Sequence, residues 1–204
     1  MADPLQLTDK VAEGNGSLVY AHPTIPGRLV KVMKDDHAAE RRGLLTRPQK
    51  RKFGAFREWA VEYDHYLTLI ARTGGCPAYQ AGFYGFEETR FGVGQVVEKI
   101  SDEGSDDLAR TIGELVKGGG DKGVAQNLLD GFFQAIEKDR AIYRDIHLWN
   151  LCVVHRADGT PDRLVAVDGI GEFTVFPLRS YSNKAYKSWH ARRWREVVAE
   201  IERL

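Results

Sequence analysis

Three polar residues in the second half of the chain have types and spacings suited to handling a phosphate ester. Asp145 is followed five residues later by Asn150, and Asp168 closes a later apolar segment. A carboxylate can orient an attacking hydroxyl, while an amide oxygen and a second carboxylate can hold Mg²⁺. Each fragment alone is common, because Asp145 could cap a turn and Asp168-Gly169 is an ordinary turn signal. The pattern gains weight only if the other parts of phosphoryl-transfer chemistry are present.

The segment Tyr143 to Asn150 reads YRDIHLWN and resembles the protein-kinase catalytic loop, H-R-D-x-x-x-x-N. Tyr143 stands at the position of the His. Asp168 follows the next apolar strand, where kinases place the Asp of D-F-G, although the Phe is missing here. We therefore expect Asp145 to orient the acceptor hydroxyl and Asn150 and Asp168 to hold Mg²⁺.

Candidate nucleotide-binding residues lie earlier in the chain. Lys31 is flanked by Val30 and Val32, so on a strand it points to the opposite face, where it could contact phosphates. A kinase lysine needs a glutamate on the next helix. Glu58 and Glu62 both qualify, and Glu62 is preferred because it is nearer the middle of that helix.

The remaining residues expected to contact the nucleotide lie in the segment 14–17 and at positions 97 and 98, and several would do so through their backbone. Gly14, Asn15, Gly16 and Ser17 can be aligned with a kinase glycine-rich loop, in which small residues let backbone N–H groups approach phosphates. Ala12 replaces the first glycine, and a plain β-turn is the alternative. Val97 and Glu98, at the end of an apolar strand and just before a linker, complete the predicted site for ATP.

Hydrophobic periodicity places these residues on elements. Strands are expected in 11–33, a helix over 56–70 with Phe56, Trp59, Ala60, Tyr63, Leu67 and Ile70 inward, and a hairpin in 83–100. A polar linker over 101–107 precedes helices at 108–116 and 125–136, strands at 151–154 and 164–167, and a final helix over 183–204 with Trp194, Val197, Val198 and Ile201 inward. This order predicts an α+β fold: one minimal protein-kinase-like domain over 1–204. Its β-rich N-lobe covers about 1–100 and its small helical C-lobe about 101–204, with the nucleotide cleft between them.

The composition limits the partners and the cellular compartment that we expect for this protein. Lys and Arg total 29 and so do Asp and Glu, so no net field favours nucleic acid. No apolar run is long enough for a transmembrane segment, and the N-terminus lacks the features of a signal peptide. Cys76 and Cys152 lack the spacing of a metal site or disulfide framework, which favours a reducing, cytoplasmic setting.

Two further motifs resemble one family. Val19-Tyr20-Ala21-His22-Pro23 and Asp168-Gly169-Ile170-Gly171-Glu172, together with Lys31-Val32 and Pro177-Leu178, are similar to the YrbL family of PhoP regulatory network proteins. The resemblance covers nearly the whole chain. It implies a compact, kinase-like protein of the bacterial cytoplasm.

Three functions remain open at this point. The leading one is a kinase-like phosphotransferase using ATP and Mg²⁺ on a hydroxyl acceptor, either a protein or a small molecule. The second is a pseudokinase that binds nucleotide without catalysis, and the third is a protein-interaction domain. Basic residues in 41–52 and 192–195 form solvated faces or meet an anionic acceptor. His147 could supply a cation near the γ-phosphate or be structural.

Overall fold

The computed structural model describes residues 3–14, 16–34, 53–172 and 178–204. Asn15, the basic segment 41–52 and Pro177 therefore lie outside the described residues. The chain divides into two compact units. Unit 1 comprises Met1–Tyr63 and Gly82–Lys99, and unit 2 comprises Asp64–Ala81 and Ile100–Leu204.

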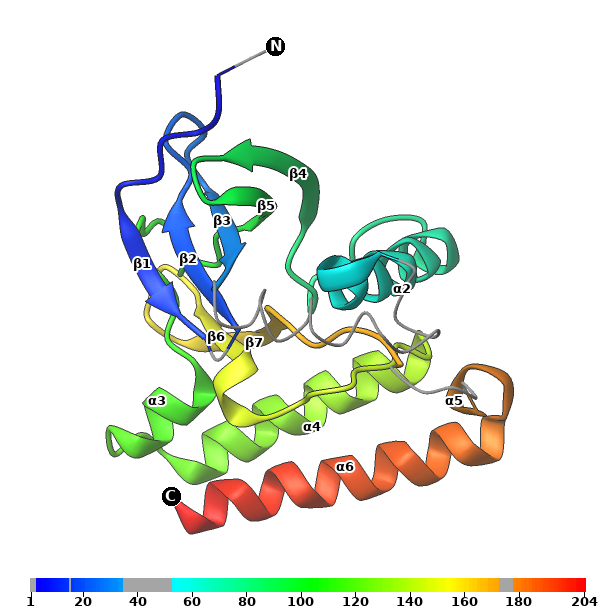
Figure 1. Ribbon diagram of the computed structural model, residues 1–204. Helices are drawn as coiled ribbons and strands as arrows, with labels where there is room; N and C mark the ends of the chain where they lie inside the picture. The colour runs from blue at the N-terminus through cyan, green and yellow to red at the C-terminus, as the bar shows by residue number, and fades with distance from the viewer. Residues whose placement is uncertain (1–2, 15, 35–52, 173–177) are drawn as a thin grey trace. The chain divides into compact units, whose positions relative to one another are not determined.

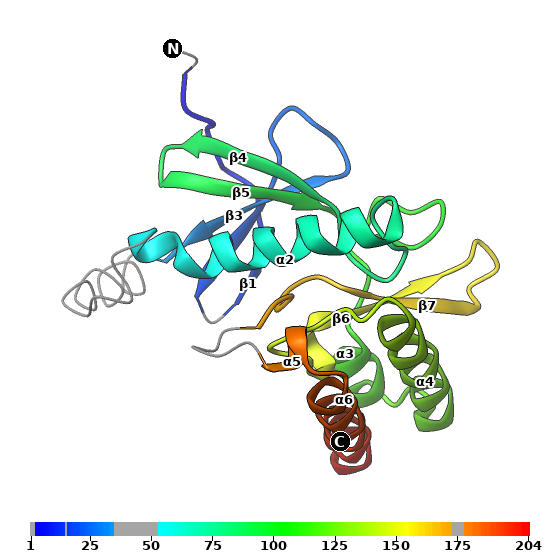
Figure 2. The ribbon, with the colours of Figure 1, turned by 90° about the vertical axis from the view of Figure 1, so that its right-hand side faces the viewer.

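Unit 1 is built on one antiparallel sheet of five strands (Figures 1 and 2). In spatial order they are β1 (Lys10–Glu13), β2 (Ser17–Ala21), β3 (Arg28–Met33), β5 (Gly92–Glu98) and β4 (Phe83–Thr89). Both faces carry apolar residues, as the alternation of side chains along a strand allows. Val30 and Val32 of β3 pack with Leu7 and Tyr20 on one face. A second buried cluster contains Val19, Leu29 and Val97.

His22 organises the turn between β2 and β3. Its Nδ1 accepts hydrogen bonds from the backbone N–H groups of Thr24 (3.2 Å) and Ile25 (3.1 Å). Its Nε2 therefore carries the proton and donates to Glu87 Oε1 at 3.3 Å. These contacts explain why the V-Y-x-H-P segment needs an imidazole, which accepts on one side and donates on the other.

Helix α2 (Arg57–Thr73) follows a single turn of 3₁₀-helix, Gly54–Phe56. Its first half belongs to unit 1, where Trp59 stacks on Phe86 and Tyr63 contacts Phe83 of β4. The predicted inward stripe was partly wrong. Phe56, Tyr63 and Leu67 are partly exposed, and the buried side chains are Trp59, Tyr66 and Leu69. The two halves of α2 belong to different units, so one continuous stripe does not describe its burial.

Unit 2 combines helices with a two-stranded hairpin (Figure 1). Its elements are α3 (Ile112–Lys117), α4 (Lys122–Lys138), the 3₁₀-helix η4 (Leu148–Asn150), β6 (Leu151–His155), β7 (Pro161–Ala166), α5 (Leu178–Tyr181) and α6 (Asn183–Arg203). Thr111 and Glu114 form a capping box on α3, and Asp121 and Ser182 cap α4 and α6. Helices α4 and α6 run side by side in Figures 1 and 2.

The inward face of α6 differs from the prediction at two positions, because Trp194 and Val198 are only partly buried. Val197 and Ile201 are buried as expected, together with Tyr186 and Trp189. Trp194 is only partly buried, and its indole N–H donates to Asp130 of α4 at 2.7 Å. The polar end of its ring explains this boundary position.

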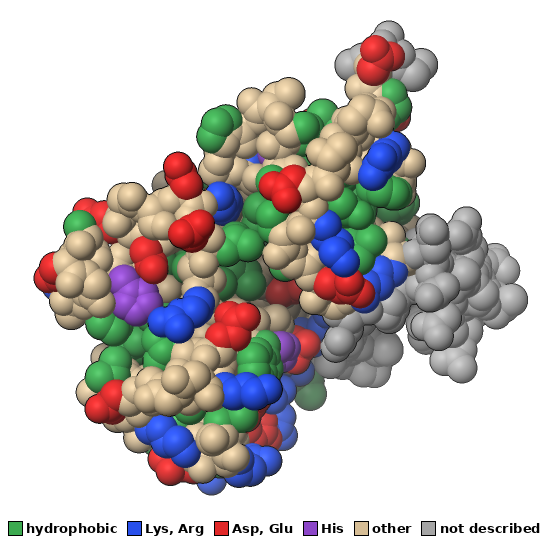
Figure 3. All heavy atoms as spheres, turned by 90° about the vertical axis from the view of Figure 1, so that its left-hand side faces the viewer, with side chains coloured by type: hydrophobic (Ala, Val, Ile, Leu, Met, Phe, Trp, Pro, Cys, Tyr) green, Lys and Arg blue, Asp and Glu red, His purple; other side chains and the backbone are tan. Residues whose placement is uncertain are grey.

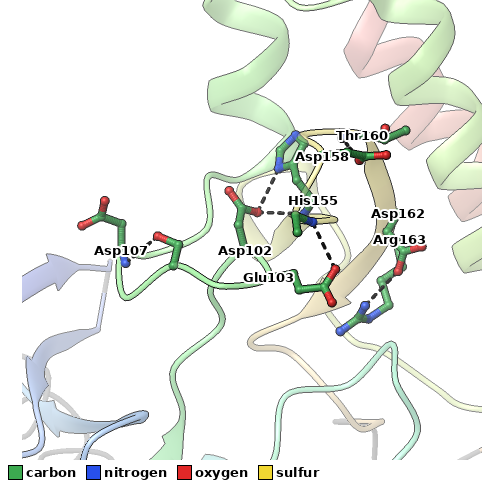
Figure 4. A network of polar contacts seen from close by, with 10 residues as sticks. Asp102, Glu103, Asp107, His155, Asp158, Thr160, Asp162 and Arg163 are labelled. Carbon is green, nitrogen blue, oxygen red and sulfur yellow. Dashed lines mark hydrogen bonds and ion pairs between the residues drawn. The ribbon is translucent and has the colours of Figure 1, made fainter.

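Polar contacts hold the 101–107 segment to the hairpin (Figure 4). Asp102 Oδ1 accepts from the backbone N–H of His155 at 2.8 Å and lies 2.9 Å from His155 Nδ1. Glu103 Oε2 accepts from the N–H of Ala157 at 3.1 Å. Burial by itself would raise the pKa of the Asp102 carboxyl, but the hydrogen bonds from His155 together lower it.

The surface is mixed in charge. Figure 3 shows acidic and basic side chains interspersed over the face that it presents. On α6, Arg192 and Arg193 both pair with Glu196, at 3.7 and 3.0 Å. In the parts of the chain described, no helix is both long and apolar enough to cross a bilayer.

Candidate active site

The segment between α4 and β6 carries the predicted catalytic loop within unit 2. Tyr143, at the position where a kinase has His, is fully buried, and its hydroxyl donates to Gln80 Oε1 at 2.7 Å. Burial raises the pKa of this hydroxyl well above its usual value, so it remains a neutral donor. Tyr143 therefore anchors the loop from inside the unit.

Asp145 lies beyond this anchor with 57% of its side chain exposed. The amide Nδ2 of Asn150 donates to the backbone carbonyl of Asp145 at 3.3 Å, which closes the loop. That bond uses the donor end of the amide and leaves Oδ1 out of it. The arrangement leaves one carboxylate and one amide oxygen available at the same short loop.

His147 also faces Asp145. Its Nδ1 accepts from the backbone N–H of Trp149 at 3.2 Å, which places the ring proton on Nε2 when the imidazole is neutral. Nε2 lies 3.7 Å from Asp145 Oδ2. This contact is too long for a direct hydrogen bond, and the bond from Trp149 N–H holds the ring in this orientation.

The segment Val167 to Gly171, which contains Asp168, is tied to this loop by three backbone hydrogen bonds. Val167 N–H donates to Asn150 (3.1 Å), Arg144 N–H to Gly169 (2.7 Å) and Gly171 N–H to Ile142 (2.7 Å). The two segments therefore lie alongside each other from end to end. Asp168 therefore lies on a segment that is paired with the loop of Asp145 and Asn150, although it is distant from them in sequence.

Gly169 makes this close approach possible. Its φ of +80° lies in the left-handed region, and a Cβ at this position would be 2.9 Å from the carbonyl oxygen of Asp145. A side chain here would therefore push directly on the loop that carries Asp145. This contact explains why glycine follows Asp168 immediately, where a kinase has Phe.

Glu172, quoted above only as part of a motif, has a definite structural role. Its buried carboxylate accepts from the backbone N–H groups of Arg179 and Ser180 and pairs with the Arg179 side chain at 3.1 Å. Its own N–H donates to His65 Nε2 at 3.1 Å. Burial lowers the pKa of His65, which keeps the ring neutral and able to accept that bond. A single sequence offered no pattern that assigns these partners.

Lys31 lies in unit 1 on β3, between Val19 of β2 and Gln95 of β5 in the sheet register. By the alternation along β3, it shares a face with Leu29. Leu29 in turn packs with Val19 and Val97. The predicted lysine therefore stands beside an apolar patch of unit 1.

The predicted glycine-rich turn joins β1 to β2. The N–H of Gly14 donates to the carbonyl of Ser17 at 2.9 Å, and the N–H of Lys34 donates to the carbonyl of Gly16 at 3.1 Å. Glu13 pairs with Lys34 (2.6 Å) and Lys10 (3.0 Å). These hydrogen bonds lower the pKa of Glu13 to about 2, so the base of the turn keeps its ion pairs at neutral pH.

The other predicted residues of unit 1 have these positions. Glu58 and Glu62 lie one turn apart on the first half of α2. Glu98, at the end of β5, accepts from the backbone N–H of Gly82 at 2.8 Å. The pairing of Lys31 with Glu62, like the nucleotide and metal roles of the whole set, stays a prediction.

Asp168 and Asn150 carry oxygen donors, which are the ligands that Mg²⁺ prefers in proteins. In the described ranges no group of three or more His, Cys, Asp and Glu side chains could hold a metal ion by itself. Mg²⁺ is commonly bound by one or two carboxylates with the rest of its shell from phosphates and water. Asp168 and Asn150 fit that kind of site.

A family model decides the classification. The model described as "PhoP regulatory network protein YrbL" matches residues 4–202. The chain belongs to this family. Among curated proteins nothing matches.

Solved structures of kinases are similar to this YrbL-family chain. The kinase domain of Mycobacterium tuberculosis PknI, as a double mutant, has a TM-score of 0.51 at 11% identity, with 81% of this chain and 58% of that chain covered. A single mutant of the same PknI domain has a TM-score of 0.49 at 14% identity, with 80% and 58% covered. The bifunctional kinase-methyltransferase WbdD has 0.47 at 15% identity, with 91% and 34% covered. The chain thus spans less than two thirds of the length of each of these kinase structures.

These comparisons confirm the predicted fold class. The protein has an α+β, protein-kinase-like fold, with an antiparallel sheet in its N-terminal part and a mainly helical C-terminal part. The predicted family is confirmed as well. At such low identity the likeness shows the fold alone.

Proposed function

We propose that this YrbL-family protein is an ATP- and Mg²⁺-dependent phosphotransferase. The observation that carries the proposal is the backbone pairing of 167–171 with 142–150, which supports a shared role for Asp145, Asn150 and Asp168. A turn that merely ended a strand would not need Asp168 to be held against the carboxylate–amide pair predicted for this chemistry.

The proposed roles follow from phosphoryl-transfer chemistry. Asn150 and Asp168 would bind Mg²⁺, which neutralises the charge on the β- and γ-phosphates. Lys31, steadied by Glu62, would contact the α- and β-phosphates. Residues 14–17 would cover the phosphates, and Val97 and Glu98 would border the base.

Asp145 would orient the acceptor hydroxyl. A new bond forms between the hydroxyl oxygen and the γ-phosphorus while the bond from that phosphorus to the β–γ bridging oxygen breaks. ADP leaves, and the hydroxyl proton passes to Asp145. Its large exposed fraction supports this role, because an acceptor must reach the carboxylate.

A transfer assay on the unmodified protein tests the proposal. The protein is incubated with γ-labelled ATP, Mg²⁺ and a bacterial extract, and label is followed into protein, small molecules and lipid. We expect label transfer that EDTA abolishes. If ATP neither binds nor loses label under these conditions, the proposal is wrong.

A nucleotide-binding pseudokinase is the second candidate. It is favoured by Ala12, which stands where a kinase has its first loop glycine and pairs with Val19 as an ordinary strand residue. This function predicts that ATP raises the melting temperature while no labelled product forms. The same assay therefore separates the two candidates.

A further inference from the structure

Unit 2 contains a cavity of about 330 Å³ that the proposed phosphotransferase chemistry does not use. It is bordered by the second half of α2, the chain after α4, Ile170 and α5. Its charged lining residues are Asp64, Arg72, Arg140 and Arg179. The size is at the lower end of the range for small-molecule sites.

The charge of this cavity is positive. The lining contains three arginines (Arg72, Arg140 and Arg179) and one carboxylate, that of Asp64. Glu172 lies behind Arg179 and is already paired with it. His65 adds no charge at neutral pH, because burial lowers its pKa. An entering ligand would therefore meet an excess of guanidinium groups.

Each arginine is also fixed in place by only part of its guanidinium. Arg72 uses Nη1 for the carbonyls of Asp139 (2.8 Å) and Arg140 (3.0 Å), near the C-terminus of α4. Arg179 uses Nε for Glu172. A guanidinium has five N–H donors, so each keeps several for a ligand. Holding the groups beforehand lowers the entropy cost of binding.

Arg140 completes the set. Its Nη2 lies 3.4 Å from the carbonyl of Arg179, and its guanidinium lies over the ring of Tyr186 at 5.4 Å. It thereby connects the end of α4 to the short helix α5. All three arginines are tied to the same small region of unit 2.

The rest of the lining combines the hydroxyls of Thr68 and Ser180 with apolar side chains. Leu69, Ala141, Ile142 and Ile170 contribute aliphatic surface, and Tyr181 contributes a largely exposed ring. Guanidinium groups match the oxygens of phosphate in paired geometry, and a phosphomonoester is a dianion above a pH of about 6. We propose that this cavity binds an organic phosphomonoester, with the phosphate on the arginines and an apolar or aromatic body against the aliphatic wall.

Phenyl phosphate is a suitable probe, measured by isothermal titration calorimetry at pH 7.5. Phenol and inorganic phosphate serve as comparisons, since each carries half of the proposed recognition. We expect phenyl phosphate to bind more tightly than both. If phenol binds equally well, the arginines do not recognise the ligand. If inorganic phosphate binds equally well, the apolar side chains of the cavity do not recognise the ligand.

Thr68 allows a charge series in the cavity without removing any arginine contact. It is exposed on α2, so Thr68→Glu, Thr68→Gln and Thr68→Lys are compatible with folding. Thr68→Glu should weaken phenyl phosphate binding about fivefold relative to Thr68→Gln, since it adds one negative charge nearby. Thr68→Lys should strengthen it. Equal affinity across the three variants would overturn the proposal.

A competition experiment keeps this site separate from nucleotide binding. Saturating ATP and Mg²⁺ should leave phenyl phosphate affinity unchanged, and so should Lys31→Met. Displacement by ATP, or loss of binding in Lys31→Met, would mean that the probe occupies the nucleotide site and that the cavity assignment is wrong. Either result leaves the proposed phosphotransferase function untouched.

Discussion

At the scale of single residues, the contact between Gly169 and Asp145 connects backbone conformation to the proposed chemistry. Gly169 adopts φ +80°, and Gly159 in the turn of the hairpin adopts a similar φ of +81°. The two differ in their surroundings. A Cβ on Gly159 meets nothing within 4 Å, whereas one on Gly169 meets the Asp145 carbonyl at 2.9 Å. The pair separates backbone strain from pressure on the catalytic loop.

We predict that Gly169→Ala is more damaging than Gly159→Ala. Both variants carry the left-handed strain, about 1–2 kcal/mol, but only Gly169→Ala also displaces Asp145. Urea denaturation should show a larger loss of stability for Gly169→Ala. Phosphoryl transfer should fall in that variant alone. Equal stability and activity of the two variants would contradict the role assigned to Gly169.

His22 offers a second test at this scale. Its ring accepts two backbone N–H groups, which would lose this acceptor after truncation. His22→Ala should therefore destabilise the protein by about 1–3 kcal/mol in urea denaturation. The matched comparison is His22→Asn, whose side-chain oxygen can still accept a hydrogen bond from these N–H groups. His22→Asn should recover part of the loss, and no recovery would point to packing instead.

At the scale of elements, Asp102 is one of two carboxylates that link the 101–107 segment to the hairpin. Asp102 has a lowered pKa because His155 donates to it from both backbone and side chain, which outweighs the opposing effect of burial. A lowered pKa in the folded state means that the ionised form adds stability above the unfolded pKa. This contribution is lost as the pH falls through the folded value.

Asp102→Asn should therefore lower the free energy of unfolding at pH 7 by about 1 kcal/mol. Because both proteins are neutral at this position in acid, the difference should shrink below a pH of about 4. Urea denaturation at several pH values measures it. Asp107→Asn, on the exposed part of the same segment, is the control and should have little effect. A difference that stays constant with pH would contradict the electrostatic account.

The elements themselves show what sequence can and cannot provide. Thr111 with Glu114, Asp121 and Ser182 are recognisable caps, and α4 follows its apolar stripe closely. The burial of α2 was less predictable because its halves join different units. Periodicity describes a helix with one neighbour, and it cannot reveal where that neighbour changes.

The candidate site divides in a similar way. The spacing of Asp145 and Asn150 and the strand end at Asp168 are encoded locally, so the pairing of their two segments could be expected, while their roles stay a prediction. The buried partners of Tyr143 and Glu172 could not, since Gln80 and Arg179 reach them only through tertiary packing. The arginine cavity is the extreme case. Its members come from four separate segments, and no short motif unites them.

At the scale of the whole molecule, nucleotide binding should appear as a gain in stability. ATP with Mg²⁺ at about 100 times its Kd should stabilise the protein by about 2.7 kcal/mol if it binds only the folded state. Thermal denaturation measures the shift, and Lys31→Met should remove most of it. Lys187→Met, which affects an exposed lysine of α6, should retain it. Equal shifts in both variants would exclude Lys31 from the site.

Single-turnover transfer by Asp145→Asn tests the central claim most directly. The variant keeps the shape of the side chain and, by the proposed roles, the nucleotide site. Transfer from γ-labelled ATP should fall at least about 10²-fold, because the acceptor hydroxyl loses its base, while ATP affinity stays close to that of the unmodified protein. Asp158→Asn, in the exposed turn of the hairpin, should transfer at the normal rate. Full transfer by Asp145→Asn would contradict the assignment of Asp145 as the catalytic residue.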